Sequence, residues 1–187
     1  MTIALIGMPG CGKSTVGRHL ARQLGSRFVD SDAEIERRIG MSIRDFFEAR
    51  GEPAFRDIEQ QVIAELSLQT GAVLSTGGGA VLRPANREAL QAHTRVIYLR
   101  STPEDLFRRL RHDTQRPLLQ VADPLQRLRE LYRERDPLYR RVAHFIVETA
   151  RPSVQALTGM VLMQLELAGL VDPNLVPSPI DAISPPG

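Results

Sequence analysis

Residues 7–14, Gly-Met-Pro-Gly-Cys-Gly-Lys-Ser, match the phosphate-binding pattern G-x-x-x-x-G-K-[ST], the P-loop, at every fixed position. The apolar segment 2–6 precedes them and predicts a strand, and residues 13–24 follow with the apolar spacing of a helix. In this strand–loop–helix order, glycines let backbone N–H groups turn toward an anion at a helix N-terminus. The sequence therefore predicts a nucleoside triphosphate site within an α/β fold.

Strand-like apolar runs alternate with helical periodicity along the rest of the chain. We expect further strands at residues 27–29, 72–75, 95–99 and 144–147. We expect helices at residues 33–39 and 43–49, after Gly51, after Thr102, at 124–141 and after Ser153. This alternation is typical of helices packed on a parallel sheet, here of five strands.

The length of 187 residues favours one domain, which we place at residues 1–170. Residues 112–123 are polar and lack a clear period, and a loop of this length in a compact domain is usually functional or disordered. Residues 171–187 contain five prolines among 17 residues. We expect this tail to be disordered.

The composition excludes several classes of protein. Twenty-four cations against 22 acids leave a net charge of +2, too small to indicate binding to nucleic acid or an anionic membrane. The N-terminal segment has no basic region and no long apolar run, so we expect neither a signal peptide nor a membrane span. Cys11 is the only cysteine, which excludes an internal disulfide. A cytoplasmic location is the expectation.

Lys13 is the only lysine among the 24 cations. In the P-loop its ammonium would contact the β- and γ-phosphates. Because no second lysine exists, the chain cannot contain the Asn-Lys-x-Asp motif with which many GTPases read guanine, and its length excludes the large motor ATPases. A small kinase or a small ATP-dependent regulator remains.

Two aspartates, Asp30 and Asp32, lie at the end of the second predicted strand. The carboxyl ends of parallel strands face the ligand crevice, so these carboxylates could face a metal ion and an acceptor hydroxyl. They could equally cap the next helix. Position alone leaves both interpretations open.

The same ambiguity applies to three other features. The glycines at 77–79 follow the third strand and permit close approach of a ligand, or they form a plain turn. Arg56 and Arg135 could be solvated surface residues or planar forks for an anion.

Six motifs in this order resemble the shikimate kinase family over residues 3–165. They are GCGKST at 10–15, DSD at 30–32, GEPAFR at 51–56, STGGG at 75–79, RPLL at 116–119 and RDPLY at 135–139. The resemblance implies a three-layer αβα P-loop fold of the nucleoside-monophosphate-kinase type, with a mobile lid at about 112–123. It also implies transfer of the γ-phosphoryl group of ATP to the 3-hydroxyl of shikimate.

The resemblance further implies a role for particular residues. The catalytic residues would be Asp32, as acceptor of the hydroxyl proton, Lys13 and Arg116 of the lid. The residues that hold shikimate would be Asp32, Arg56, Gly78, Gly79 and Arg135. ATP would contact Gly10, Cys11, Gly12, Lys13, Ser14, Thr15, Arg109, Arg116, Arg151 and Pro152. Mg²⁺ would be bound directly by Ser14 and through water by Asp30 and Ser75.

The expected partners are therefore shikimate and ATP, with Mg²⁺ as cofactor and a monomeric chain. Two alternatives remain: a kinase for another small hydroxy acid such as gluconate, and a nucleotide-gated regulator of the same fold without turnover. The presence of Asp32, Arg56 and Arg135 on the acceptor side favours the shikimate kinase.

Overall fold

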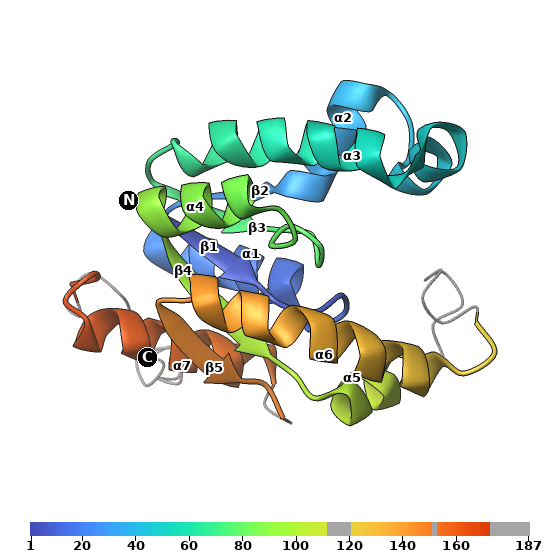
Figure 1. The fold of residues 1–187 in the computed structure, drawn as a ribbon. Helices are drawn as coiled ribbons and strands as arrows, with labels where there is room; N and C mark the ends of the chain where they lie inside the picture. The colour runs from blue at the N-terminus through green and yellow to red at the C-terminus, as the bar shows by residue number, and fades with distance from the viewer. Residues whose placement is uncertain (112–120, 151–152, 173–187) are drawn as a thin grey trace, which may run out of the picture.

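A computed structural model describes residues 1–111, 121–150 and 153–172. Its centre is a parallel sheet of five strands in the order β2-β3-β1-β4-β5 (Figure 1). The strands are β1 (Thr2–Ile6), β2 (Arg27–Asp30), β3 (Ala72–Ser75), β4 (Thr94–Arg100) and β5 (Phe145–Glu148). The predicted α/β fold with five parallel strands is confirmed.

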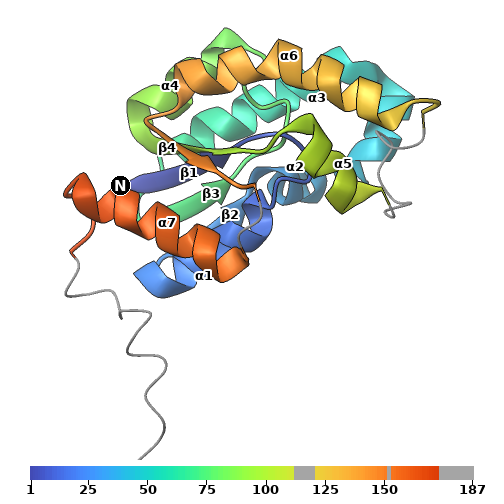
Figure 2. The same cartoon turned by 90° about the horizontal axis from the view of Figure 1, so that it is seen from below.

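Helices cover both faces of the sheet. Figure 2 shows α1 (Lys13–Leu24) and α7 (Val154–Leu167) on one face, with α3 (Ile43–Ser67), α4 (Pro84–His93) and α6 (Pro124–Val142) on the other. Two shorter helices pack on the second layer, α2 (Ser31–Ile39) against α3 and α5 (Pro103–Leu110) against α6. This arrangement is the predicted three-layer αβα sandwich.

The core is built around β1, whose five residues are all buried. β1 lies between β3 and β4, with Ile3 opposite Val73 on one side and Arg95 on the other. A strand buried on both faces requires the continuous apolar run that the sequence shows at this place. Because β1 runs directly into the P-loop, the loop is held at the middle of the sheet edge.

Most helix starts follow the local signals in the sequence. The Thr102 hydroxyl accepts a hydrogen bond from the Asp105 amide at 3.2 Å, and the Ser153 hydroxyl accepts one from the Ala156 amide at 3.2 Å. Both are N-caps that satisfy an amide of the first turn. No helix in the described part of the chain is long and apolar enough to cross a membrane.

Two elements differ from the sequence prediction. Helix α4 was not predicted, because only Asn86 and Leu90 of its ten residues are buried and they make no apolar stripe. The two helices expected on either side of Gly51 form one element, α3, with Gly51 in a non-helical conformation at φ 82° and ψ 170°. The predicted lid lies outside the described residues except for 121–123, as does the tail from 173 onward.

Candidate active site

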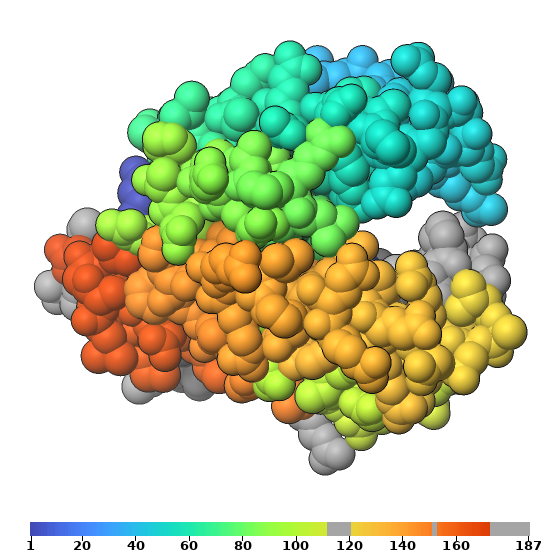
Figure 3. Space-filling view, viewed as in Figure 1, coloured from blue at the N-terminus to red at the C-terminus, as the bar shows by residue number. Residues whose placement is uncertain are grey.

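The carboxyl ends of β1, β2 and β3 meet on one side of the molecule, where the arrowheads of Figure 1 point. On that side the surface is notched below the cyan start of α3 (Figure 3). A cavity of about 350 Å³ lies at the strand ends. It is lined by Pro9, Gly10, Gly12, Lys13, Ser14, Thr15, Asp30, Asp32, Thr76, Gly77 and Gly78.

The P-loop forms one wall of this cavity. Gly10 and Gly12 have φ angles of 82° and 95°, a left-handed conformation that glycine adopts without strain. Gly12 is the N-cap residue of α1, so the amides of the first turn are directed at the cavity. The side chain of Lys13 is buried, and its Nζ donates to the carbonyl oxygens of Gly7 at 2.7 Å and Met8 at 2.9 Å. These contacts hold the ammonium group beside the loop.

Two further predicted nucleotide contacts lie next to the P-loop. Cys11 is fully buried, and its Sγ lies 3.7 Å from Lys13 Nζ. A side chain as small as that of cysteine fits this buried position. Arg109 of α5 donates to the Cys11 carbonyl at 3.4 Å and to the Thr149 carbonyl at 2.6 Å. Arg109 thus connects the loop after β5 to the P-loop. Arg116, Arg151 and Pro152 lie outside the described residues.

Three oxygen-bearing side chains gather beside the P-loop. The Ser14 hydroxyl donates to Asp30 Oδ2 at 3.0 Å and lies 3.3 Å from the Ser75 hydroxyl. Hydroxyl and carboxylate oxygens are the hard donors that Mg²⁺ prefers, so this group fits the ion. Among the described residues, no group of three or more His, Cys, Asp or Glu is placed to hold a metal ion, so Mg²⁺ bound here would need phosphate and water oxygens as further ligands.

The contacts of Asp30 show whether this acid caps the next helix or faces the phosphate loop. Its Oδ1 accepts from the amides of Asp32 and Ala33 at 2.9 and 3.3 Å, so it is the N-cap of α2. Its Oδ2 meanwhile faces Ser14. The residue therefore caps the helix with one oxygen and faces the phosphate loop with the other.

Asp32 lies in the first turn of α2 and projects into the same cavity. Burial raises the pKa of Asp32 to about 6, and the nearby carboxylates of Asp30 and Glu59 act in the same direction. Lys13 opposes this effect. At neutral pH the carboxylate is therefore ionised but close to its pKa, which suits a group that accepts a proton.

The three glycines after β3 pack against residues from separate elements. A Cβ atom on Gly77 would lie 2.7 Å from Asp32 Oδ1, and one on Gly78 would lie 2.6 Å from the Pro9 ring. A Cβ atom on Gly79 would overlap the guanidinium of Arg56. Any side chain here would displace its neighbour, so the glycines permit close approach and are more than a plain turn.

Arg56 lies against Gly79, and neither Arg56 nor Arg135 lines the cavity. The Arg56 side chain is only 12% exposed, which excludes a solvated surface arginine, and it donates to Glu59 at 2.9 Å and to Glu52 at 3.2 Å. Arg135 of α6 is half-buried, and its Nε has no hydrogen-bond partner within the described residues. Arg56 is thus fixed beside the glycine segment, and Arg135, whose charge acts on Glu59, keeps a free Nε donor within the described residues.

Sequence reasoning missed Glu59, which is 1% exposed and has one carboxylate oxygen without a partner in the described part of the chain. Burial raises the pKa of Glu59, and the charges of Arg56 and Arg135 oppose that rise. Its position three residues after Arg56 on one helix was the available signal.

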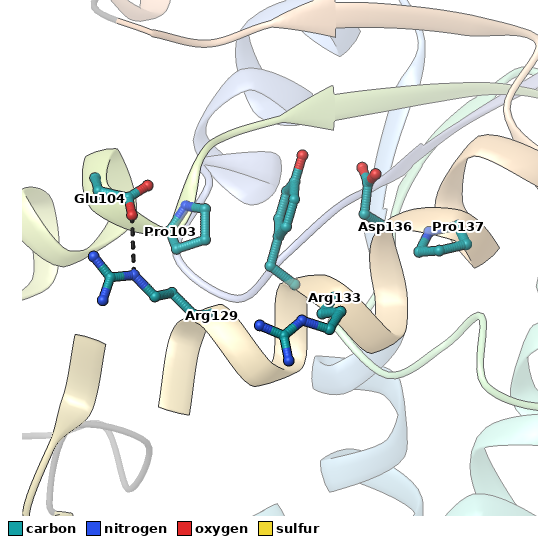
Figure 4. A pocket seen from close by; sticks show the side chains of 7 residues that line it. Pro103, Glu104, Arg129, Arg133, Asp136 and Pro137 are labelled. Atoms are coloured by element: carbon teal, nitrogen blue, oxygen red, sulfur yellow. Dashed lines mark hydrogen bonds and ion pairs between the residues drawn. The ribbon is translucent and has the colours of Figure 1, made fainter. Parts of the chain in front are cut away.

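A second cavity, of about 500 Å³, lies between α5 and α6 (Figure 4). Arg129 donates to Glu104 at 3.1 Å across one end of it, and Asp136 lies near the other. It is larger than the cavity at the strand ends, but none of its lining residues belongs to the P-loop or to the glycine segment. The chemistry of the strand-end cavity, and not size, identifies the candidate active site.

The fold and the phosphate loop define this chain as a P-loop phosphotransferase of the nucleoside-monophosphate-kinase type. The family model "Shikimate kinase" matches residues 9–166. The chain belongs to the shikimate kinase family, and the assignment suggested by its motifs is confirmed.

Individual relatives agree with this assignment. A shikimate kinase from Paracidovorax citrulli is 58% identical over 177 residues, which cover 93% of this chain and 97% of that protein. One from Ralstonia nicotianae is 53% identical over 182 residues, with coverage of 97% and 96%. The solved shikimate kinase from Acinetobacter baumannii in complex with shikimate has a TM-score of 0.85 and 46% identity, with coverage of 91% and 95%.

Proposed function

We propose that this chain transfers the γ-phosphoryl group of ATP directly to the 3-hydroxyl of shikimate. One observation carries the proposal: Lys13 and Ser14 of the phosphate loop and the carboxylate of Asp32 line the same cavity. A donor phosphate and an acceptor hydroxyl can therefore meet there without a covalent enzyme intermediate. The P-O bond to ADP breaks, the bond to the 3-hydroxyl oxygen forms, and the hydroxyl proton leaves.

Asp32 is the residue that accepts this proton. Two observations support this role: its carboxylate is ionised above pH 6, and it lines the cavity beside Gly77. A base held in hydrogen-bond reach of the hydroxyl also orients the attacking oxygen toward the phosphorus.

Arg56 and Arg135 would bind the shikimate carboxylate. Bidentate guanidinium–carboxylate pairs fix orientation as well as charge. Glu59 and Glu52 hold Arg56 from its own helix, while Arg135 comes from α6. Two arginines on separate helices would fix the ring between them, with Gly78 and Gly79 allowing close approach.

The phosphate side would be stabilised by charge. Lys13 and the amides at the start of α1 would contact the β- and γ-phosphates, and Arg116 would reach them from the lid. Ser14 would hold Mg²⁺ directly, with Asp30 and Ser75 binding its water ligands. When bound, Mg²⁺ neutralises charge on the phosphate oxygens. Arg109, Arg151 and Pro152 would border the adenine.

The two alternatives predict different substrates. A gluconate-type kinase would need an open-chain acceptor in place of a ring, and a regulator would bind nucleotide without turnover. ADP release should be measured with shikimate, gluconate and nucleoside monophosphates, and the product position determined by ³¹P NMR. We expect turnover with shikimate alone, and the absence of shikimate-dependent ADP would reject the proposal.

A pair of variants on α6 tests the carboxylate assignment. Arg135→Ala should raise the shikimate KM by at least tenfold, the usual cost of a charged hydrogen-bonded pair, and should leave the ATP KM nearly unchanged. Arg133→Ala is the matched control, because Arg133 is exposed on the same helix. Equal effects of Arg135→Ala on both substrates would count against its role. We further propose that the chain is a cytoplasmic monomer. Light scattering of the purified chain would test the monomeric state, and fractionation of cells would test the location.

A further inference from the structure

Tyr139 connects helix α6 to the glycine segment behind the active site. It lies one helical turn after Arg135 and is 0% exposed. Its hydroxyl donates a hydrogen bond of 2.5 Å to the carbonyl oxygen of Gly78. This contact joins residues 61 positions apart in the chain.

The bond fixes the orientation of one peptide group. The Gly78 carbonyl and the Gly79 amide belong to the same planar trans peptide, so their C=O and N–H bonds point in opposite directions. With the carbonyl held by Tyr139, the Gly79 N–H is directed away from α6. Neither the Gly78 nor the Gly79 amide donates to an acceptor within the residues that the structure describes.

The glycine segment has no side chains of its own to set this orientation. Pro9 packs on one side of Gly78 and the Arg56 guanidinium on Gly79, and both contacts are steric. Steric contact restricts where the segment lies but does not select the direction of a peptide dipole. The Ala80 amide donates to the Gly77 carbonyl oxygen at 3.1 Å across this turn, which is compatible with either orientation of the central peptide, so the Tyr139 hydroxyl is the contact that distinguishes the two.

The Tyr139 ring packs against the ring of Tyr98, whose hydroxyl bonds a separate partner. The ring centroids lie 4.9 Å apart, and the Tyr98 hydroxyl donates to Asp136 at 2.6 Å. Asp136 accepts from Arg140 at 2.9 Å. Burial raises the pKa of both tyrosines above the ordinary value, so both hydroxyls remain protonated donors throughout the pH range of enzyme assays.

We propose that Tyr139 is a positioning residue for the shikimate subsite, and that its hydroxyl orients the Gly78–Gly79 peptide so that the Gly79 amide faces the bound acid. The inference rests on the proposed function. It adds that α6 serves the subsite twice, through the guanidinium of Arg135 and through the hydroxyl one turn later.

The variant Tyr139→Phe removes the hydroxyl and keeps the ring. Loss of one oriented hydrogen bond should raise the shikimate KM roughly three- to tenfold, with kcat and the ATP KM within about twofold of wild type. Tyr98→Phe is the matched control. It removes the hydroxyl of the other ring of the pair, and that hydroxyl bonds Asp136 and not the glycine segment. It should lower the Tm and leave the shikimate KM within about twofold.

The split between KM and stability decides the question. A lower Tm of Tyr139→Phe with an unchanged shikimate KM would make the hydroxyl merely structural and overturn the proposal. Equal changes in the two substrate KM values, or equal shikimate KM changes in both variants, would overturn it as well. If wild type shows no shikimate-dependent ADP release, the proposed function fails, a result distinct from failure of this inference.

Hydrogen–deuterium exchange of the wild-type chain gives a test that needs no variant. Shikimate should slow exchange of the peptide that contains Gly78 and Gly79, while an ATP analogue alone should not. Unchanged exchange of this peptide on addition of saturating shikimate would overturn the proposal even if Tyr139→Phe does not fold.

Discussion

Replacement of Asp32 by Asn separates the catalytic value of this carboxylate from its cost to the fold. Burial and the neighbouring carboxylates of Asp30 and Glu59 raise the pKa of Asp32 from 3.8 to about 6. Because its folded-state pKa lies above the unfolded value, the native chain binds this proton more tightly than the unfolded chain. Ionised Asp32 therefore destabilises the fold above pH 6, and the effect disappears below about pH 4.

The size of the effect follows from the two pKa values. A pKa of about 6 in place of 3.8 corresponds to about 3 kcal/mol at pH 8. Asp32 is half-buried, and water screening reduces this figure, so we expect Asp32→Asn to gain about 1–2 kcal/mol. This gain corresponds to a Tm rise of roughly 2–8 °C for a chain of this size. At pH 5, between the two pKa values, about half of the gain should remain.

Urea unfolding of wild type and Asp32→Asn at pH 8, 6 and 5 measures the gain. Asp57→Asn is the control, because Asp57 is 73% exposed in its pair with Arg83 and should change stability by less than about 0.5 kcal/mol at each pH. A variant no more stable than wild type at pH 8, or a gain that is constant from pH 8 to pH 5, would refute the electrostatic reasoning.

Activity of the same variant tests the role of the base. Removal of a general base costs about 10²–10⁴ in kcat, whereas binding of an ATP analogue should be nearly intact. The kcat/KM of wild type should fall as pH drops through about 6, because the protonated carboxyl cannot accept the hydroxyl proton. Near-wild-type turnover by Asp32→Asn would remove Asp32 from this role.

Three further substitutions test separate parts of the structure. Gly79→Ala places a Cβ atom against the Arg56 guanidinium, so steady-state kinetics should show a roughly tenfold higher shikimate KM and an unchanged ATP KM; no change would mean that Arg56 moves aside freely. Gly17→Ala places a Cβ atom 2.7 Å from the Phe28 ring, and urea unfolding should show a loss of about 1–3 kcal/mol. Wild-type stability would contradict the tight packing of α1 on β2. Ser14→Ala should lower kcat at least tenfold and raise the Mg²⁺ concentration needed for half-maximal rate, and an unchanged Mg²⁺ requirement would exclude Ser14 as a ligand.

The elements predictable from the sequence are those whose signals are local. Strand β1 is predictable because burial on both faces requires a continuous apolar run. Helix α1 is predictable from Lys13 to Leu24 because one amphipathic stripe runs along it. Helix α4 was missed because it buries too few residues to produce a period, although Pro84 in its first turn was a usable signal.

The site residues also divide into those with a local sequence signal and those without one. The P-loop and the acids at the end of β2 were placed correctly at the cavity by the rule that strand ends face the ligand. Whether Arg56 is solvated could not be decided from the sequence, because its 12% exposure depends on its contact with the distant Gly79. Tyr139 had no local signal for its contact, since its partner Gly78 belongs to a distant segment. The catalytic and binding roles of the site residues stay predictions.

The central place of β1 also determines when a nascent chain can fold. β1 is synthesised first, but its partners begin at Ala72 and Thr94, so its hydrogen bonds on both sides wait for about a hundred residues of synthesis. At ribosomal rates this delay lasts about 5–20 s. Throughout it, at least one edge of this uncharged, β-prone segment lacks its partner strand and is exposed to aggregation. A fragment that ends before β4 should therefore be insoluble, which is a consequence of holding the phosphate loop at the middle of the sheet.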